Sequence, residues 1–189
     1  MALAGAILGY HVASRLAYVI GVGVALRRQE RHHVFTRNAG VEAGFRRFRR
    51  IAATLMNNDA VSFILLCVVT RRTGLTAPPP ALLAVGVALI LVGVAIKLWA
   101  AWRLGSAAYY WHNFFAPDDP VAPDPPGPYR FLRNPMYTLG YLQTYGLALV
   151  CGSLPGLVVA TFDQAAILTF YHSVEKPHFE SLIKGRRAS

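Results

Sequence analysis

A few polar side chains stand in an otherwise apolar sequence, and three of them could act as a general base. Asp59 lies within a long apolar stretch, His112 lies in an aromatic run at residues 109–115, and Glu175 follows the last apolar stretch. A carboxylate or an imidazole within hydrogen-bond reach of a substrate can accept a proton from it. The sequence therefore predicts proton-transfer chemistry at Asp59, His112 or Glu175.

The two aspartates inside apolar stretches, Asp59 and Asp163, have two interpretations. Ionisable groups in such surroundings are costly to bury, which makes each of them a functional candidate. Buried charges also pair with one another, and Arg15 and Lys97 are the available partners for Asp59. Both interpretations stay open for Asp59, whereas we expect Asp163 to pair within the protein.

The composition predicts a membrane protein. The chain has 189 residues, of which 54% are hydrophobic and only 15% are charged, against about 25% charged in a typical soluble domain. So apolar a chain is not disordered. Its only cysteines, Cys67 and Cys151, lie in apolar runs, which argues against a disulfide framework.

Four apolar stretches are long enough to cross a bilayer, which takes about 20 residues of helix. The last of them is long enough for two crossings, and Gly152–Gly156 near its middle is typical of a tight turn. The sequence thus predicts an all-α, polytopic membrane bundle of about five transmembrane helices that ends in a helical hairpin. The stretches are Ala2–Leu26, Ile51–Thr70, Ala81–Leu104 and Asn134–Val174.

The basic residues predict the orientation of the bundle. The formal net charge is +10, and eight arginines fall within residues 27–50. Arginine accumulates in cytoplasmic loops, so we expect this loop, residues 103–133 and the C-terminal tail to face the cytoplasm. A nucleic-acid patch would require a soluble module with polar and aromatic readers, and the sequence offers none. The charge excess therefore indicates topology rather than nucleic-acid binding.

The segment that follows the third stretch gathers aromatic and polar residues at this expected cytoplasmic surface. Its aromatic run is followed by the proline-rich PDDPVAPDPPGP, which is typical of a stiff, extended connector. Aromatic residues there either anchor helix ends at the interface or contact a substrate. The residues that we predict to bind substrate are Asn57, Tyr110, Trp111 and Asn113.

The C-terminal half carries a combination of motifs in a fixed order. The run GPYRFLRNPMYTLGY at residues 127–141, an apolar hairpin and EKPHF at residues 175–179 follow one another, and KLWAAWRLG at residues 97–105 precedes them. Together they resemble a family of integral-membrane methyltransferases that includes isoprenylcysteine carboxyl methyltransferases and phospholipid N-methyltransferases. Asn134, followed by Pro135, Met136 and Tyr137, looks more like phosphatidylethanolamine N-methyltransferase.

The resemblance implies S-adenosylmethionine as the cofactor, in a cytoplasm-facing pocket that the hairpin and the tail form. An arginine such as Arg133 suits its carboxylate, an acid such as Glu175 suits its ammonium or ribose, and Gly140 permits close approach. The sequence departs from the family pattern at Lys176, where a second acidic residue is usual. The implied cofactor-binding residues are Tyr129, Arg133, Asn134, Pro135, Tyr137, Gly140 and Glu175.

The leading functional hypothesis is methylation of a phospholipid amine, with phosphatidylethanolamine first. Prenylated cysteine or another lipophilic acceptor, and a non-catalytic lipid-binding scaffold, are the alternatives. We expect residues 1–96 to form an N-terminal membrane part and residues 97–189 the methyltransferase core. The expected location is a bacterial inner membrane or the endoplasmic reticulum. His32 and His33 lack a third ligand at suitable spacing, so no metal site is predicted.

Overall fold

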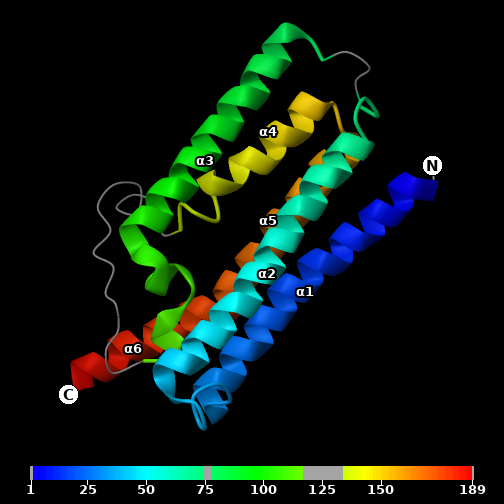
Figure 1. Ribbon diagram of the computed structural model, residues 1–189. Coiled ribbons are helices and arrows are strands. Elements are labelled where there is room, and N and C mark those ends of the chain that lie inside the picture. Colours follow the sequence, from blue (N-terminus) through cyan, green and yellow to red (C-terminus); the bar gives the residue numbers. More distant parts are fainter. Residues whose placement is uncertain (1, 75–77, 117–133, 189) are drawn as a thin grey trace.

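The structure is a bundle of helices (Figure 1). The computed structural model describes residues 2–74, 78–116 and 134–188, with side chains described up to residue 182. Within these ranges every regular element is helical and no strand occurs. Four helices are long and apolar enough to cross a membrane, and a shorter apolar helix accompanies them. The expected polytopic all-α bundle is therefore confirmed.

Three long helices make up the first two thirds of the fold. They are α1 (Ala2–His32), α2 (Gly40–Val69) and α3 (Pro80–Tyr109). Pro79 and Pro80 begin α3, where a missing backbone N–H costs nothing. Gly105 interrupts α3 near its end, with φ of 68° and ψ of 167°, values that suit glycine because it lacks a Cβ.

The expected hairpin is present as α4 (Leu142–Cys151) and α5 (Leu154–Phe170). Gly152 adopts the left-handed conformation, with φ of 60°, after the last turn of α4. The Ser153 hydroxyl then caps α5 by accepting a hydrogen bond from the Gly156 N–H at 2.9 Å. The glycine and the serine thus build the turn that the sequence predicts.

The first arm of the hairpin is shorter than we expected. α4 has 10 residues, which corresponds to about 15 Å, half of a bilayer's hydrocarbon core. The apolar stretch that we expected to form the hairpin begins at Asn134, but regular structure begins only at the 3-10 turn Leu139–Tyr141. The Asn134 side chain accepts a hydrogen bond from the Tyr137 N–H at 3.2 Å, and the Pro135 carbonyl accepts one from the Gly140 N–H at 2.9 Å. These local bonds hold a turn where a helix would otherwise continue.

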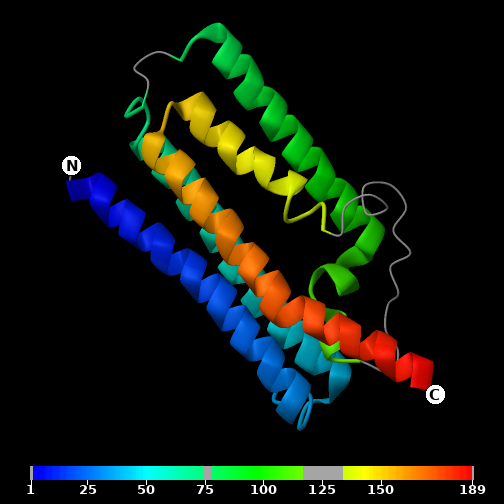
Figure 2. The same ribbon diagram turned by 180° about the vertical axis from the view of Figure 1, so that it is seen from behind.

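The helices form two groups. α3 and α4 lie side by side, and α1, α2 and α5 form the second group, as the two opposite views show (Figures 1 and 2). Glycines bring α3 and α4 into backbone contact, because a Cβ at Gly93 would lie 2.4 Å from the Gln143 nitrogen. Close approach through small residues is a common way to pack helices in membranes.

The end of α5 continues as a π-helix, Tyr171–Glu175, and then as α6 (Lys176–Ala188). π-Helical turns are rare and frequently occur at functional sites. The extra residue turns Glu175 into the protein, and Arg27 donates a 2.6 Å hydrogen bond from Nη2 to the Ser173 carbonyl. This carboxylate therefore owes its position to the local widening of the helix.

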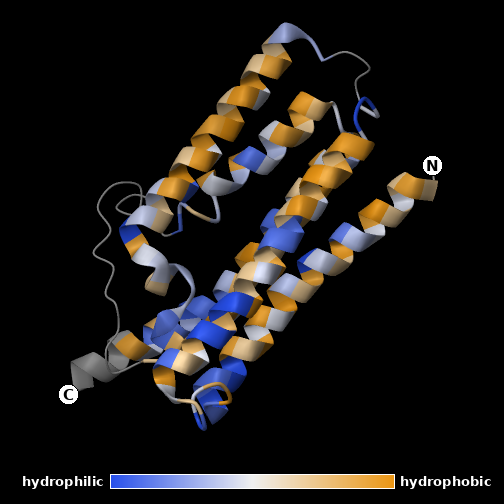
Figure 3. Ribbon diagram, viewed as in Figure 1, coloured by the Kyte–Doolittle hydropathy of each residue, from blue (hydrophilic) through white to orange (hydrophobic). Residues whose placement is uncertain are grey.

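Hydropathy changes along the bundle (Figure 3). The end that holds the start of α3 is hydrophobic, whereas the opposite end, where α1 meets α2, is hydrophilic. We call the latter the arginine-rich end, after the arginines in residues 27–50. Large apolar side chains such as Leu91 and Leu98 are exposed on α3, as expected for a surface that faces lipid. That the arginine-rich end faces the cytoplasm stays a prediction.

Replacing Gly146 by alanine is expected to destabilise the α3–α4 pair. Its Cβ would lie 2.4 Å from the Gly86 carbonyl oxygen and 2.8 Å from the Ile90 nitrogen, so the helices must move apart. Overpacking of this kind costs about 1–3 kcal/mol. Thermal unfolding in detergent measures the loss, with Gly5→Ala as the control because nothing lies within 4 Å of that position. Equal unfolding midpoints for the two variants would contradict this packing.

Candidate active site

A cavity of about 420 Å³ lies between the two groups of helices. This volume falls within the range of small-molecule sites, about 300–1,000 Å³. Its walls come from α1, α2, α3, α4 and the segments that precede α4 and the short 3-10 helix η1 (His112–Phe114), so the hairpin supplies only one side of it. Its polar or aromatic lining residues are Arg15, Tyr18, Asn57, Asp59, Lys97, Tyr109, Trp111, Tyr137, Tyr141, Gln143 and Thr144.

The cavity is graded from polar to apolar. Asp59 and Lys97 line its middle, and Phe63 lies one turn from Asp59 on α2, away from the arginine-rich end. Ile90 lies two turns from Lys97 in the same direction on α3. The aromatic residues Trp111 and Tyr137 line the side nearer the arginine-rich end. The apolar lining residues are Met56, Ala60, Phe63, Ile64, Ile90, Val94, Met136 and Leu147.

A buried ion network forms one wall of the cavity, with Arg15 at its centre. Arg15 Nη2 lies 2.8 Å from Asp59 Oδ2, and Arg15 Nε lies 2.9 Å from Asp163 Oδ1. Its Nη1 donates a 3.0 Å hydrogen bond to the Tyr141 hydroxyl. The planar guanidinium can make these contacts in three directions at once. One arginine on α1 thus ties together α2, α5 and the turn that precedes α4.

His11 extends this network by one turn of α1. Its Nε2 lies 3.2 Å from both carboxylate oxygens of Asp163, and its Nδ1 lies 2.7 Å from the Ser62 hydroxyl. The imidazole is fully buried. Buried polar groups require such partners because water cannot satisfy them.

Glu175 lies behind the aromatic wall and is buried. Its Oε1 accepts a 2.6 Å hydrogen bond from Trp111 Nε1 and a 2.5 Å bond from the Tyr137 hydroxyl. Burial first, and the nearby carboxylate second, raise the pKa of Tyr137 well above its usual value, so the phenol stays protonated and donates. Both donors therefore bind the same carboxylate oxygen, Oε1.

The backbone around Trp111 is unusual. Trp111 adopts a left-handed conformation, with φ of 59°, between the end of α3 and the short 3-10 helix η1 (His112–Phe114). A bulky residue rarely adopts this conformation, and the cost is about 1–3 kcal/mol. Its indole bond to Glu175 compensates for part of that cost. Strain of this kind clusters at functional sites.

Some of the predicted catalytic and substrate-binding residues meet at the cavity and others do not. Asn57, Asp59 and Trp111 line it. His112 packs instead against the Phe45 ring, with the ring centroids 4.7 Å apart, and its Nδ1 has no partner within the described part of the chain. Tyr110 packs on the apolar core. It does not line the cavity, and neither do His112 and the buried Asn113.

The predicted cofactor-binding residues are similarly divided. Tyr137 lines the cavity, and the Glu175 carboxylate is bonded to it. Asn134 and the buried Pro135 form the turn before α4. A Cβ at Gly140 would lie 3.0 Å from the Lys97 side chain, so this glycine makes room for the lysine. The two remaining members of the predicted set, Tyr129 and Arg133, lie outside the described residues.

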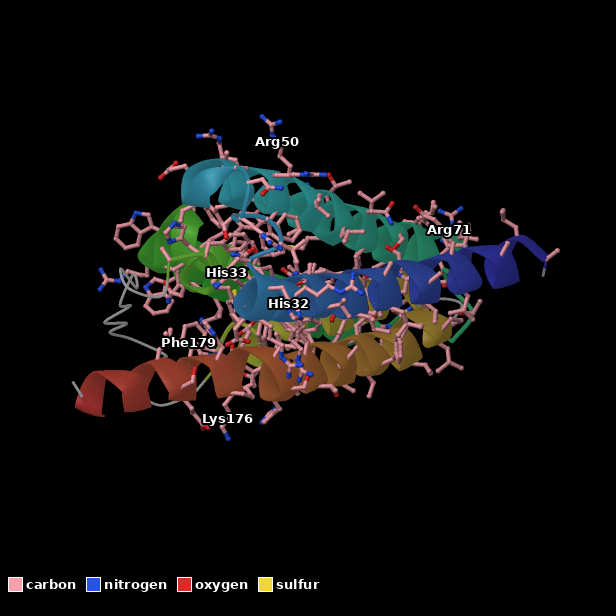
Figure 4. All side chains as sticks on the ribbon, turned by 90° about the horizontal axis from the view of Figure 1, so that it is seen from below. His32, His33, Arg50, Arg71, Lys176 and Phe179 are labelled. Carbon is pink, nitrogen blue, oxygen red and sulfur yellow. The ribbon has the colours of Figure 1, made fainter. Side chains whose placement is uncertain are left out.

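Lys176, the departure from the family pattern, points away from the bundle (Figure 4). Its ammonium lies 3.8 Å from the Glu180 carboxylate one turn further along α6, and both side chains are exposed. The lysine therefore does not contact the Glu175 cluster. Within the described ranges, no group of three His, Cys, Asp or Glu side chains is arranged to hold a metal ion.

Comparison with protein families shows to which family the chain belongs. The sequence model of a family described as phospholipid methyltransferase matches residues 81–184, which is more than half of the chain. This chain belongs to the phospholipid methyltransferase family. The matched range includes α3, α4, α5 and most of α6, so within this family member Arg15 and Asp59 come from helices outside the match.

The first curated relatives of this family member are yeast proteins. Phosphatidylethanolamine N-methyltransferase 1 of Vanderwaltozyma polyspora is 24% identical over 208 residues, which cover 90% of this chain and 25% of the relative. The Zygosaccharomyces rouxii enzyme of that name is 25% identical over 93% of the chain. The Saccharomyces cerevisiae protein is 36% identical over 50% of the chain and 11% of its own length. No solved structure matches the chain.

The chain spans about a quarter of the length of the first two relatives, as the 25% coverage of each shows.

Several cavity residues were absent from our predicted site, notably Arg15, Lys97 and Tyr141. From the sequence, Arg15 and Lys97 were expected as possible ion-pair partners of Asp59 and not as lining of a site. Their position inside apolar stretches was the signal that could have placed them in the site, because charges there are functional candidates by default.

Proposed function

We propose that this protein transfers a methyl group from S-adenosylmethionine to the amine of a phospholipid, with phosphatidylethanolamine as the first acceptor to test. The observation that carries the proposal is the graded cavity in a member of the phospholipid methyltransferase family. A lipid acceptor needs apolar walls for its chains and a charged end for its headgroup. Both are present within one cavity.

The donor is proposed to bind next to Glu175. The carboxylate accepts the bonds from Trp111 and Tyr137 through Oε1, and Oε2 would accept one from an ammonium or a ribose hydroxyl. The residues present therefore fit S-adenosylmethionine, and Asn134 and Tyr137 would hold it together with Glu175. When bound, the cofactor supplies a methyl group that its positively charged sulfur activates.

The residues of this chain would align and deprotonate the acceptor. An amine is protonated in water and must lose that proton before it can attack a methyl group. Asp59 is the proposed general base, because its Oδ1 lacks a partner in the described structure while Oδ2 is held by Arg15. Alignment of the reactants and exclusion of water can supply several kcal/mol of the barrier, roughly 7–11 at best.

The alternative acceptor, a prenylated cysteine carboxylate, fits the cavity less well. That nucleophile is already an anion, so it needs no base, and it would leave the buried Asp59 Oδ1 without a donor. The non-catalytic alternative requires that the Glu175 cluster bind no donor.

Incubation of the purified protein with methyl-labelled S-adenosylmethionine tests the proposal. Vesicles of phosphatidylcholine that contain phosphatidylethanolamine should yield labelled monomethyl-phosphatidylethanolamine. Vesicles of phosphatidylcholine alone should yield no labelled lipid, because its nitrogen already carries three methyl groups. Label transferred only to an added prenylcysteine would contradict the phospholipid assignment. Failure to bind S-adenosylhomocysteine in calorimetric titration would favour the scaffold.

A further inference from the structure

Only one of the two carboxylate oxygens of Asp59 has a partner among the described residues. Its Oδ2 pairs with Arg15 at 2.8 Å, whereas Oδ1 is buried and has no hydrogen-bond partner among the described residues. Asp59 is 5% exposed and lines the cavity. A buried acceptor without a partner is costly. The cavity therefore contains a position where a donor with positive charge would be stabilised.

Lys97 supplies a charge of the opposite sign on the facing helix. Its ammonium lies 4.8 Å from the centre of the Tyr141 ring and lines the same cavity. No carboxylate lies within 4.0 Å of it in the described structure, and it interacts with Asp59 only at longer range. An ammonium over an aromatic face is partly stabilised. It still has donors to offer to an oxyanion.

The cavity reaches the lipid-facing surface beside these two charges. Ile64 on α2 and Val94 on α3 line it, and they are 51% and 37% exposed. Val94 lies one turn from Lys97, and Ile64 lies between one and two turns from Asp59. The opening between α2 and α3 is therefore apolar, which suits acyl chains better than a water-soluble molecule.

We propose that Asp59 and Lys97 form a two-pole site for a zwitterionic lipid headgroup, in which Asp59 Oδ1 accepts the ammonium and Lys97 Nζ binds the phosphate. Arg15 is occupied by Asp59, Asp163 and Tyr141, so it positions Asp59 and does not bind the lipid itself. The site selects lipids that carry both charges. This inference rests on the proposed function, since it assigns the acceptor to this cavity.

Two molecules of the proposed reaction carry an ammonium together with an oxyanion. One is the phospholipid headgroup, and the other is the amino-acid part of the methyl donor. The apolar opening beside the two poles favours the lipid. The experiment must therefore measure both ligands on the same variants.

Binding measured without any methyl donor tests the site. The probes are dihexanoyl-phosphatidylethanolamine, dihexanoyl-phosphatidic acid, which lacks the ammonium, and S-adenosylhomocysteine. We expect Asp59→Asn to weaken phosphatidylethanolamine binding by about tenfold to a hundredfold and to leave phosphatidic acid unchanged. Lys97→Gln should weaken both lipids by about tenfold or more, and Lys97→Arg should restore them, because a phosphate needs only the charge.

The matched control variants remove one lysine charge and one carboxylate charge outside the cavity. Lys176→Gln and Glu180→Gln affect an exposed ion pair on α6, and neither should change lipid binding. Retained phosphatidic acid binding shows that Asp59→Asn is folded. The two variants Lys97→Gln and Lys97→Arg test the proposal independently of Asp59→Asn.

Three results would overturn the proposal. They are equal weakening of both lipids by Asp59→Asn, unchanged lipid binding in Lys97→Gln, and loss of S-adenosylhomocysteine binding with lipid binding intact. The last result would assign the two poles to the methyl donor. The binding assay involves no methyl transfer. If the separate methylation assay yielded no methylated lipid, that result would contradict the proposed function, whereas the headgroup preference measured by binding would still stand.

Discussion

Replacement of Arg15 by methionine is expected to destabilise the protein more than any other single substitution considered. The guanidinium neutralises Asp59 and Asp163, which are buried on two other helices. Removal of one member of a buried ionic cluster typically costs about 3–5 kcal/mol, because the remaining charges lose their partner. That is a large part of the 5–15 kcal/mol that usually stabilises a folded protein. Thermal unfolding in detergent should show a strongly lowered midpoint.

A second substitution distinguishes lost charge compensation from lost packing. Arg15→Met combined with Asp163→Asn removes one of the two stranded carboxylates and should recover part of the midpoint. Arg46→Met is the matched control, because Arg46 pairs with Glu42 at 3.7 Å on an exposed surface, where an ion pair contributes about 0–1 kcal/mol. If Arg15→Met and Arg46→Met unfold at the same temperature, the network does not stabilise the bundle.

Replacement of Glu175 by glutamine is expected to weaken binding of S-adenosylhomocysteine by about tenfold to a hundredfold, the range for loss of a hydrogen bond to a charged group. The amide oxygen can still accept the bonds from Trp111 and Tyr137. The fold should therefore persist while the negative charge is lost. Calorimetric titration measures the affinity, and methylation of phosphatidylethanolamine should fall with it when the donor is limiting.

Glu180→Gln makes the same chemical change one turn further along α6. Glu180 is exposed and pairs with Lys176 at 3.8 Å, so its substitution should leave donor affinity unchanged. Glu175→Ala gives a further comparison, because it leaves the Trp111 and Tyr137 donors without an acceptor and should also lower stability. Wild-type donor affinity in Glu175→Gln would remove this carboxylate from the donor site.

Much of the fold follows from local patterns in the sequence. Long apolar stretches predict the membrane helices, and the Gly152–Gly156 segment predicts the turn of the hairpin, because glycine and serine there satisfy the ends of both helices. The short α4 was not predictable in this way. Residues 134–141 are compatible with a helix, and the turn depends on the Asn134 side chain and the Pro135 carbonyl, whose choice of partners is not visible in a pattern.

The site was predictable only in part, because it depends on which helices are neighbours. Asp59 and Glu175 could be named from their residue types, and Arg15 or Lys97 could be named as partners of Asp59. That Arg15 also binds Asp163, from a helix far along the chain, required the packed bundle. His112 was a candidate by residue type alone, and the aromatic cluster around Phe45 directs its ring away from the cavity.

The half-length of α4 determines the depth of the turn that precedes it. Because α4 rises only about 15 Å, the turn at residues 134–138 lies within the thickness of the hydrocarbon. Irregular backbone is tolerated at that depth only inside protein or beside an aqueous inlet. Pro135 and Tyr137 are buried, so the protein itself encloses this turn. The missing half-helix thus places Tyr137 and the cavity that it lines at the depth of the hydrocarbon, where a bilayer-dissolved reactant can arrive without leaving its own phase.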